Sequence, residues 1–125
     1  MKNDQDQVPG MRNDRKYDCI IIGAGPGGLQ AAIHLARYNR RVLLIDRGGG
    51  RTMHARHIVN YLGVPEISGR ELIAAGLEQI RKFGVEVVKE PVTRVEKSDF
   101  FTVHTRAGAF QGLFVIVSTL SLIHI

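Results

Sequence analysis

Apolar residues along the chain form short uninterrupted runs separated by polar and glycine-rich stretches. Three of the runs, at residues 18–22, 41–46 and 113–118, lack the alternation of a half-exposed strand. Runs of this length predict strands that are buried on both faces of a parallel sheet. Further strands are predicted at the β-branched and apolar segments 85–89, 92–97 and 101–105, the last followed by a turn at Ala107-Gly108.

Two other segments place apolar residues at helical spacing. The first runs from Pro26 to about Tyr38, and Asn39 suits the left-handed residue that ends a helix. The second begins at a capping box formed by Ser68 and Glu71 and ends at Gly84. Strand, helix and strand over residues 18–46 make a βαβ unit, which is right-handed in nearly all proteins.

Two stretches fit neither pattern. Residues 1–16 are polar and without periodicity, which predicts a disordered tail and an ordered domain over 17–119. Residues 48–69 form a long irregular connection, and connections of this length in a compact domain tend to be functional.

Composition places the chain among small globular proteins. Its 125 residues suit one domain, with 44% hydrophobic and 23% charged residues. No apolar run approaches the roughly 20 residues of a membrane helix, and no secretory signal opens the chain. We therefore expect a cytoplasmic protein that does not enter the membrane.

The net charge of +5 is spread along the chain, and aromatic residues make up only 6%. This pattern favours a solvated basic surface over nucleic-acid binding. The single cysteine, Cys19, lies in an apolar run and is expected to be a small buried hydrophobe. One cysteine excludes an internal disulfide or a CxxC redox pair within these residues.

The segment from Gly23 to Gly28 fits the G-x-G-x-x-G fingerprint of dinucleotide-binding proteins. It follows a predicted strand, opens a predicted helix, and precedes a strand that ends in Asp46, 18 residues after Gly28. Gly23 allows a tight turn, Gly25 lets the backbone approach a pyrophosphate, and Gly28 lets the helix lie against the sheet. The helix amino terminus then faces the diphosphate. A glycine-rich turn that binds nothing is the alternative.

Asp46 lies where a carboxylate accepts hydrogen bonds from a ribose diol. The same carboxylate repels a 2′-phosphate, so the site should prefer FAD or NAD over NADP. The fingerprint alone leaves the choice between FAD and NAD open.

From Tyr17 to Thr119 the chain resembles the amino-terminal half of the FAD domain of low-molecular-weight thioredoxin reductases. The resemblance rests on six segments in the family's order, which are residues 49–52, 59–63, 67–72, 83–87, 101–105 and 115–119. It implies a thioredoxin reductase-like, class II pyridine nucleotide-disulfide oxidoreductase with a Rossmann-like α/β fold, in which a β-hairpin is inserted. The chain ends early, so we expect an incomplete domain.

The resemblance also implies how FAD is held. The loop from Gly49 to Asn60 would run along the flavin, with Asn60 near the isoalloxazine ring, the backbone of Val92 at the adenine, and Thr119 close to the cofactor. The implied cofactor-binding residues are Gly23, Ala24, Gly25, Pro26, Gly27, Gly28, Asp46, Arg47, Gly50, Arg51, Asn60, Val92 and Thr119.

Two residues depart from the family pattern, because Arg51 replaces its usual glutamine and Leu62 replaces a proline. Arg51 either neutralises a phosphate or the flavin pyrimidine end, or is an exposed loop arginine. His54 and His57 lie in the same loop, and with no carboxylate or thiol accompanying them we expect loop histidines and no metal site. Glu66, Glu71 and Glu78 are expected at caps and on solvent faces, and no catalytic residue is assigned.

The last residues match nothing in the resembled family. Where its Thr-Gly should follow Ser118, the chain reads Thr119 and then residues 120–125, which resemble one reading frame of a transposase end sequence used in sequencing libraries. We interpret 120–125 as a non-native tail on a truncated chain, and a natural short terminal strand is the alternative. The family's NAD(P)H domain and redox CxxC would lie downstream, leaving this fragment inactive and its sheet and flavin site partly uncovered.

The resemblance predicts an FAD-dependent NAD(P)H oxidoreductase of the thioredoxin-disulfide reductase type, a homodimer when full length. Its acceptor would be a small thioredoxin-like or ferredoxin-like protein or a small disulfide. Alternatives are a ferredoxin–NADP reductase or dithiol oxidase of the same architecture, and a non-catalytic dinucleotide-binding redox sensor.

Overall fold

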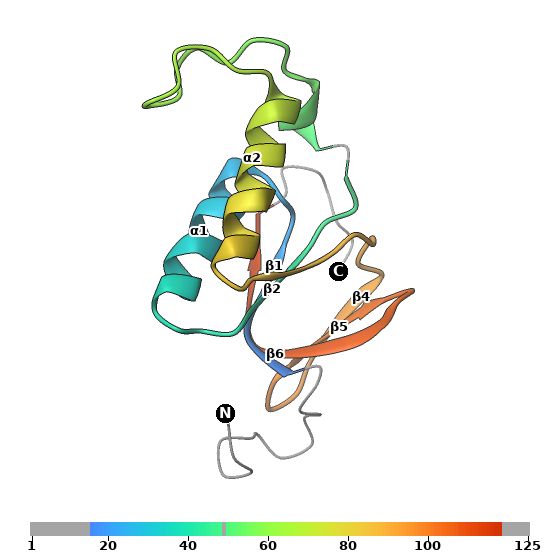
Figure 1. Ribbon diagram of the computed structural model, residues 1–125. Helices are drawn as coiled ribbons and strands as arrows, with labels where there is room; N and C mark the ends of the chain where they lie inside the picture. Colours follow the sequence, from blue (N-terminus) through green and yellow to red (C-terminus); the bar gives the residue numbers. More distant parts are fainter. Residues whose placement is uncertain (1–15, 49, 119–125) are drawn as a thin grey trace.

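The computed structural model describes residues 16–48 and 50–118. They form one six-stranded sheet in the order β3-β2-β1-β6-β5-β4, with two helices on one face (Figure 1). The strands are β1 (Lys16–Ile22), β2 (Val42–Ile45), β3 (Glu86–Val88), β4 (Arg94–Lys97), β5 (Phe101–Thr105) and β6 (Gly108–Val117). The first four in sheet order are parallel, whereas β5 and β4 form antiparallel pairs. This confirms the predicted α/β fold with a β-hairpin insertion.

The predicted βαβ unit is present as β1, α1 (Pro26–Arg37) and β2. Asn39 ends the helix with a φ of 60°, as its side chain allows. Strand β1 begins two residues earlier than predicted, because Lys16 and Tyr17 pair with Gln111 and Gly112 of β6 and are buried. The predicted tail therefore loses its last residue to the sheet, and residues 1–15 lie outside the described part of the chain.

Helix α2 (Gly69–Lys82) begins at the predicted capping box. The Ser68 hydroxyl accepts the Glu71 amide at 3.2 Å and donates to the Glu71 carboxylate at 2.9 Å. The carboxylate therefore binds the capping hydroxyl, in place of the Ser68 backbone amide that a full box would use. Gly84 takes a φ of 87° and ends the helix as predicted. None of the described helices is long and apolar enough to span a membrane.

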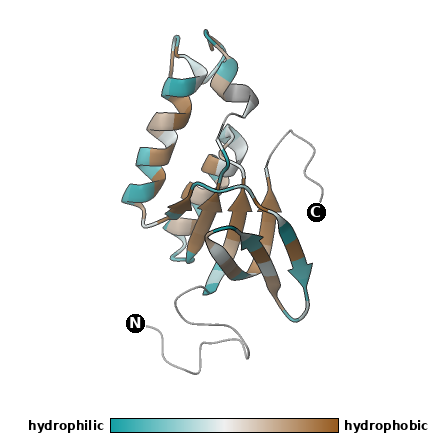
Figure 2. Ribbon diagram, turned by 90° about the vertical axis from the view of Figure 1, so that its right-hand side faces the viewer, coloured by the Kyte–Doolittle hydropathy of each residue, from teal (hydrophilic) through white to brown (hydrophobic). Residues whose placement is uncertain are grey.

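The sheet separates two apolar clusters, because successive side chains of a strand point to opposite faces. On the helix side, Cys19, Ile21 and Leu44 pack with residues of α1 and α2. On the other side, Ile20, Ile22, Leu43 and Ile45 pack with Val103 and Phe110 of the hairpin. Figure 2 shows the resulting hydrophobic colour along the central strands.

The last strand differs from its prediction in length and burial. It was expected over 113–118 as a buried strand, but β6 begins at Gly108 and runs unbroken to Val117. Strand β5 pairs only with residues 108–112, so 113–117 have β1 on one side and no described strand on the other. As a result Phe114 is 68% and Val117 49% exposed.

An open cavity of about 260 Å³ lies beside this strand. Its lining includes Cys19 of β1, Leu35 of α1, and Leu113 and Phe114 of β6. Phe114 is in register with Cys19 and therefore shares the face that the helices cover elsewhere in the sheet. The cavity therefore lies where the two helices cease to cover this face of the sheet.

The connection between β2 and α2 contains more structure than predicted. A 3₁₀ turn, η3 (Arg51–His54), is followed by isolated antiparallel bridges between Ile58 and Ile67 and between Tyr61 and Val64. The segment 58–67 is thus hairpin-like, and it extends beyond the amino end of α2 (Figure 1).

Candidate dinucleotide-binding site

The candidate site lies where three parallel strands end at the same edge of the sheet. Gly23 follows β1, Asp46 follows β2, and Ser118 follows β6. The chain proceeds from β1 outward through β2 to β3, and later returns to place β6 on the opposite side of β1. Open α/β sheets bind ligands at such a reversal, outside the carboxyl ends of the strands.

The loop after β1 has the geometry that anion binding requires. Gly23 has a φ of 107°, a left-handed conformation that favours glycine, and its amide donates to Ile45 O at 2.8 Å. Gly25 is the extended N-cap residue of α1, and Pro26 occupies the first turn. The first amides of a helix lack partners within it, so those of Gly27 and Gly28 point out of the amino end of α1 with its positive dipole.

The glycines of this loop differ in why the fold needs them. A Cβ at Gly28 would overlap the Ser118 hydroxyl and come within 2.6 Å of Gly23 O, so only glycine fits. A Cβ at Gly25 would meet Ser118 O at an ordinary 3.6 Å, and one at Gly27 would meet nothing within 4 Å. Packing within the described chain therefore explains Gly28 but not Gly25 or Gly27. The space that they leave fits a ligand that approaches the backbone closely, as a pyrophosphate does.

Asp46 joins the loop after β1 to the loop after β2. One carboxylate oxygen accepts the Ala24 amide at 3.2 Å, and the other accepts the Gly48 amide at 3.1 Å. A carboxylate oxygen has two lone-pair sites, so each still has capacity for a ligand hydroxyl. The side chain is half-buried at the position from which a ribose diol would be bound.

The remaining predicted residues differ in their exposure. Arg47 and Gly50 are exposed just beyond Asp46, and Val92 is partly buried against the hairpin-side cluster. Asn60 is exposed in the segment 58–67. The backbone of Arg51 lies in η3. Gly49, Thr119 and residues 120–125 lie outside the described residues.

The residue that sequence reasoning missed is Ser118. Its amide donates to Ile22 O at 2.9 Å and its hydroxyl donates to Gly23 O at 2.7 Å, so it joins β6 to the start of the glycine loop. The available signal was its place, since Ser118 is the last residue of a strand predicted to be parallel to the one that precedes the fingerprint.

The histidines of the long connection have one partner that sequence reasoning overlooked. His57 Nδ1 and Glu66 Oε1 are 2.7 Å apart, across the bridge between Ile58 and Ile67. Both side chains are mostly exposed, so the pair contributes little to stability. Within 16–48 and 50–118, no three histidine, cysteine or acidic residues gather as metal ligands would. Glu71 caps α2, and Glu78 pairs with Lys82 on its exposed face, as expected of both.

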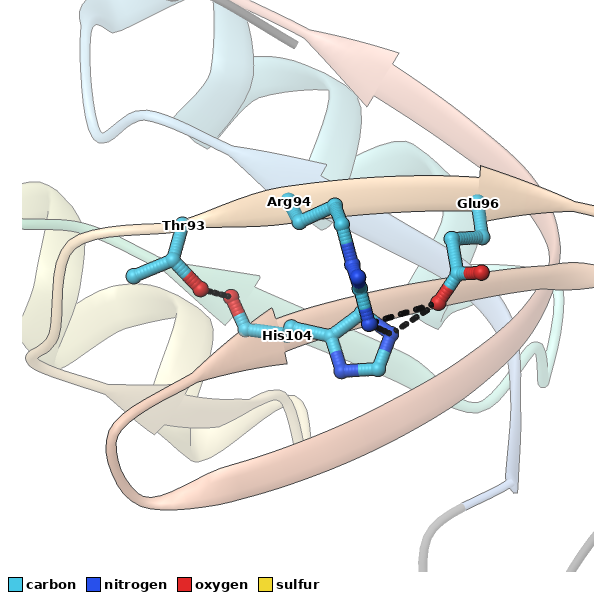
Figure 3. A network of polar contacts seen from close by, with 4 residues as sticks. All are labelled: Thr93, Arg94, Glu96 and His104. Atoms are coloured by element: carbon cyan, nitrogen blue, oxygen red, sulfur yellow. Dashed lines mark hydrogen bonds and ion pairs between the residues drawn. The ribbon is translucent and has the colours of Figure 1, made fainter.

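Two polar clusters lie outside the candidate site. On the hairpin, Glu96 Oε1 lies 2.6 Å from His104 Nε2 and 3.0 Å from an Arg94 guanidinium nitrogen (Figure 3). At the amino ends of the strands, the Tyr17 hydroxyl donates to Glu86, and the Arg41 guanidinium lies over the Tyr17 ring. The first cluster joins the neighbouring strands β4 and β5, and the second joins β1 to β3 across the start of β2. Both lie away from the carboxyl-end edge.

Two buried groups of β1 have raised pKa values. Burial, and then the hydrogen bond to Glu86, raise the pKa of Tyr17 to about 12. Burial, and then the charge of Asp18, raise the pKa of the Cys19 thiol to about 11. A thiol that stays protonated at neutral pH is a poor nucleophile, so Cys19 is a structural residue as predicted.

The chain is similar to known proteins over most of its length. The sequence profile of the pyridine nucleotide-disulphide oxidoreductase family matches residues 17–112. A thioredoxin reductase from Aquifex aeolicus strain VF5 is 40% identical over 111 residues, covering 85% of this chain and 34% of that protein. A thioredoxin reductase from Peptoclostridium litorale is 38% identical over 107 residues, covering 82% and 34%.

A solved structure gives the same result for the fold. Thioredoxin reductase from Streptococcus pyogenes MGAS5005 superposes with a TM-score of 0.81 at 34% identity, over 90% of this chain and 38% of that one. The chain therefore spans about a third of the length of the curated relatives it matches.

Proposed function

Because this chain belongs to the pyridine nucleotide-disulphide oxidoreductase family, we propose that it is the FAD-binding amino-terminal part of a thioredoxin reductase-like flavoprotein. The observation that carries the proposal is the glycine loop at the carboxyl end of β1. Gly25 and Gly27 have no packing requirement within the described chain, and the amino end of α1 opens beside them. A dinucleotide pyrophosphate explains both features, because it approaches the glycine backbone closely and binds at a helix amino terminus.

In this proposal each part of the site holds one part of FAD. The loop from Gly23 to Gly28 holds the pyrophosphate, Asp46 holds the ribose of the adenosine half, and the backbone of Val92 contacts the adenine. Arg47, Gly50, Arg51, Asn60 and Thr119 complete the cofactor wall by family resemblance. Bound FAD supplies the hydride and electron chemistry, while the chain binds, orients and shields it.

The activity of the whole protein follows from the same resemblance. We propose reduction by NAD(P)H and delivery of electrons to a disulfide of a small thioredoxin-like protein, in a homodimeric enzyme. The parts that would bind NAD(P)H and carry the redox cysteines would belong to the two thirds of the relatives that this chain does not match. Within the part of the chain that the structure describes, residues 113–117 pair with β1 only, which supports an incomplete FAD domain over 17–119.

Titration of the purified chain with FAD, followed by flavin fluorescence, tests the proposal. We expect weak binding that does not survive gel filtration, since part of the domain is missing. Gly25→Asp should abolish it, because the fold has room for a Cβ at Gly25 but a carboxylate there would repel the pyrophosphate. Ala74→Asp adds the same charge on the exposed face of α2 and should leave binding unchanged.

Competition separates the dinucleotides. NAD⁺ should displace FAD more readily than NADP⁺, because the 2′-phosphate meets the Asp46 carboxylate. A folded chain that binds no FAD at millimolar concentration, or whose binding ignores Gly25→Asp, contradicts the proposed site.

A further inference from the structure

Ser118 makes more contacts with β1 than its place in the sheet requires. The parallel ladder needs only its amide, which donates to Ile22 O at 2.9 Å. Its hydroxyl adds a short hydrogen bond to Gly23 O at 2.7 Å and a longer one to Ile22 O at 3.3 Å. The side chain therefore acts on the residue at which β1 turns into the glycine loop.

The hydroxyl completes the fixation of Gly23. The Gly23 amide is held from one side by Ile45 O of β2 at 2.8 Å, and its carbonyl is held from the other side by Ser118. Because the peptide group is planar, fixing the Gly23 carbonyl also fixes the direction of the next amide, that of Ala24. The Ala24 amide donates to Asp46 at 3.2 Å, so the carboxylate and the loop are aligned through one peptide group.

Ser118 also determines how α1 sits at the site. Its hydroxyl fills the space that a Cβ at Gly28 would take, and its own Cβ lies 3.1 Å from that position. The first turn of α1 thus rests directly on the Ser118 side chain. This contact determines where the first free amides of the helix point.

We propose that Ser118 is a positioning residue for the pyrophosphate-binding loop, holding the Gly23 carbonyl and the first turn of α1 in the arrangement that a dinucleotide diphosphate needs. The inference rests on the proposed function, since the diphosphate is the ligand of that site. Ser118 acts through Gly23 and Gly28 and need not touch the ligand itself.

The test compares Ser118→Ala with Ser118→Thr in the full 125-residue chain. Ser118→Ala keeps the strand amide and the Cβ but removes the hydroxyl donor, so the dissociation constant for FAD should rise about 3- to 10-fold, the effect of one net hydrogen bond. Hydrogen exchange of the Ala24 amide should speed up by a similar factor, without any ligand present. Ser118→Thr keeps the donor and should remain within about twofold of the wild-type chain.

Thr105→Ala is the matched control. It removes a hydroxyl that donates to a carbonyl at a similar 3.0 Å, that of Gly108 at the hairpin turn. It should leave both FAD affinity and Ala24 exchange unchanged, which separates loop positioning from a general loss of stability measured by urea unfolding.

The two readouts also separate this inference from the proposed function. Faster Ala24 exchange in Ser118→Ala, with no FAD bound by any variant, supports the role of Ser118 in the loop and contradicts the proposed ligand. Unchanged exchange and unchanged affinity in Ser118→Ala, with FAD bound by the wild-type chain, overturn the role of Ser118 and leave the proposed function standing.

Discussion

Two apolar strands of the same sheet have very different surroundings. All four residues of β2 are buried, because β1 and β3 flank it and both its faces are covered. The outer half of β6, residues 113–117, is equally apolar in sequence, but Phe114 is 68% and Val117 49% exposed. The difference lies in the neighbours, since this half of β6 is paired on one side only within the described residues.

The comparison shows that an uninterrupted apolar run indicates a strand but does not establish that the strand is covered. Such a run is suited to a strand with neighbours on both edges and both faces. Within residues 16–48 and 50–118, strand β2 has those neighbours, whereas residues 113–117 of β6 lack a strand on one edge. The exposure of residues 113–117 is therefore an observation that supports the proposed incomplete FAD domain.

The largest expected effect contrasts one side chain from each strand. Leu44→Ala in β2 should lower the free energy of unfolding by about 2–5 kcal/mol, since Leu44 is fully buried. Phe114→Ala in β6 should lower it by less than about 1 kcal/mol, although the side chain is larger. Urea denaturation followed by circular dichroism measures both, and equal losses would contradict the comparison.

A smaller effect is expected at alkaline pH on the well-covered side of the sheet. Folding raises the pKa of Tyr17 from 10.0 to about 12, so its contribution is complete below pH 10 and is lost as the pH rises toward 12. The loss is on the order of 2 kcal/mol, from a shift of two pKa units. The raised pKa of Cys19 adds a decline that begins nearer pH 9.

Unfolding measured from pH 8 to pH 12 in the wild-type chain and Tyr17→Phe isolates the tyrosine contribution. The variant should lose the share of the decline above pH 10 that Tyr17 causes, and keep the share that Cys19 causes between about pH 9 and pH 11. A variant as sensitive as the wild-type chain would show that the burial of the Tyr17 hydroxyl and its hydrogen bond to Glu86 do not couple its ionisation to stability.

The smallest change in stability is expected for Phe114→Lys, which should instead change the self-association of the chain. An apolar strand edge with unpaired amides and carbonyls invites pairing with other chains, so the wild-type chain should associate as its concentration rises. A lysine at Phe114 should suppress this association while unfolding stays nearly unchanged. Sedimentation velocity measures the association, with Val59→Lys as a control at another exposed apolar side chain. If both variants reduced association equally, the strand edge would not be its cause.

Features governed by local chemistry were predictable from the sequence. The capping pair of Ser68 and Glu71, the left-handed Asn39 and the glycine loop each depend on residues close together in the chain. The start of β6 was missed because Gly112 interrupts its apolar pattern, and at Gly112 the strand passes closely over Ile20 and changes neighbours.

Contacts between distant residues had no such signal. The hydrogen bond from Ser118 to Gly23 spans 95 positions, and it depends on β6 lying beside β1. Periodicity predicted a parallel sheet but not the order of its strands, so the partner of Gly28 could not be identified. The exposure of Phe114 was also unpredictable, because a sequence pattern does not show which strands and helices pack beside a given strand.

The position of Cys19 makes its thiol a probe of how often the neighbouring part of the sheet opens. As the only cysteine, it lines the cavity beside the open half of β6 but is itself 4% exposed. A thiol-specific reagent can therefore label it only while this part of the sheet is open. When the sheet recloses faster than the thiol reacts, the labelling rate reports the opening equilibrium. Any polypeptide that covers residues 113–117 of β6 would slow the labelling. The labelling rate of this one cysteine would thus measure how well that part of the sheet is covered.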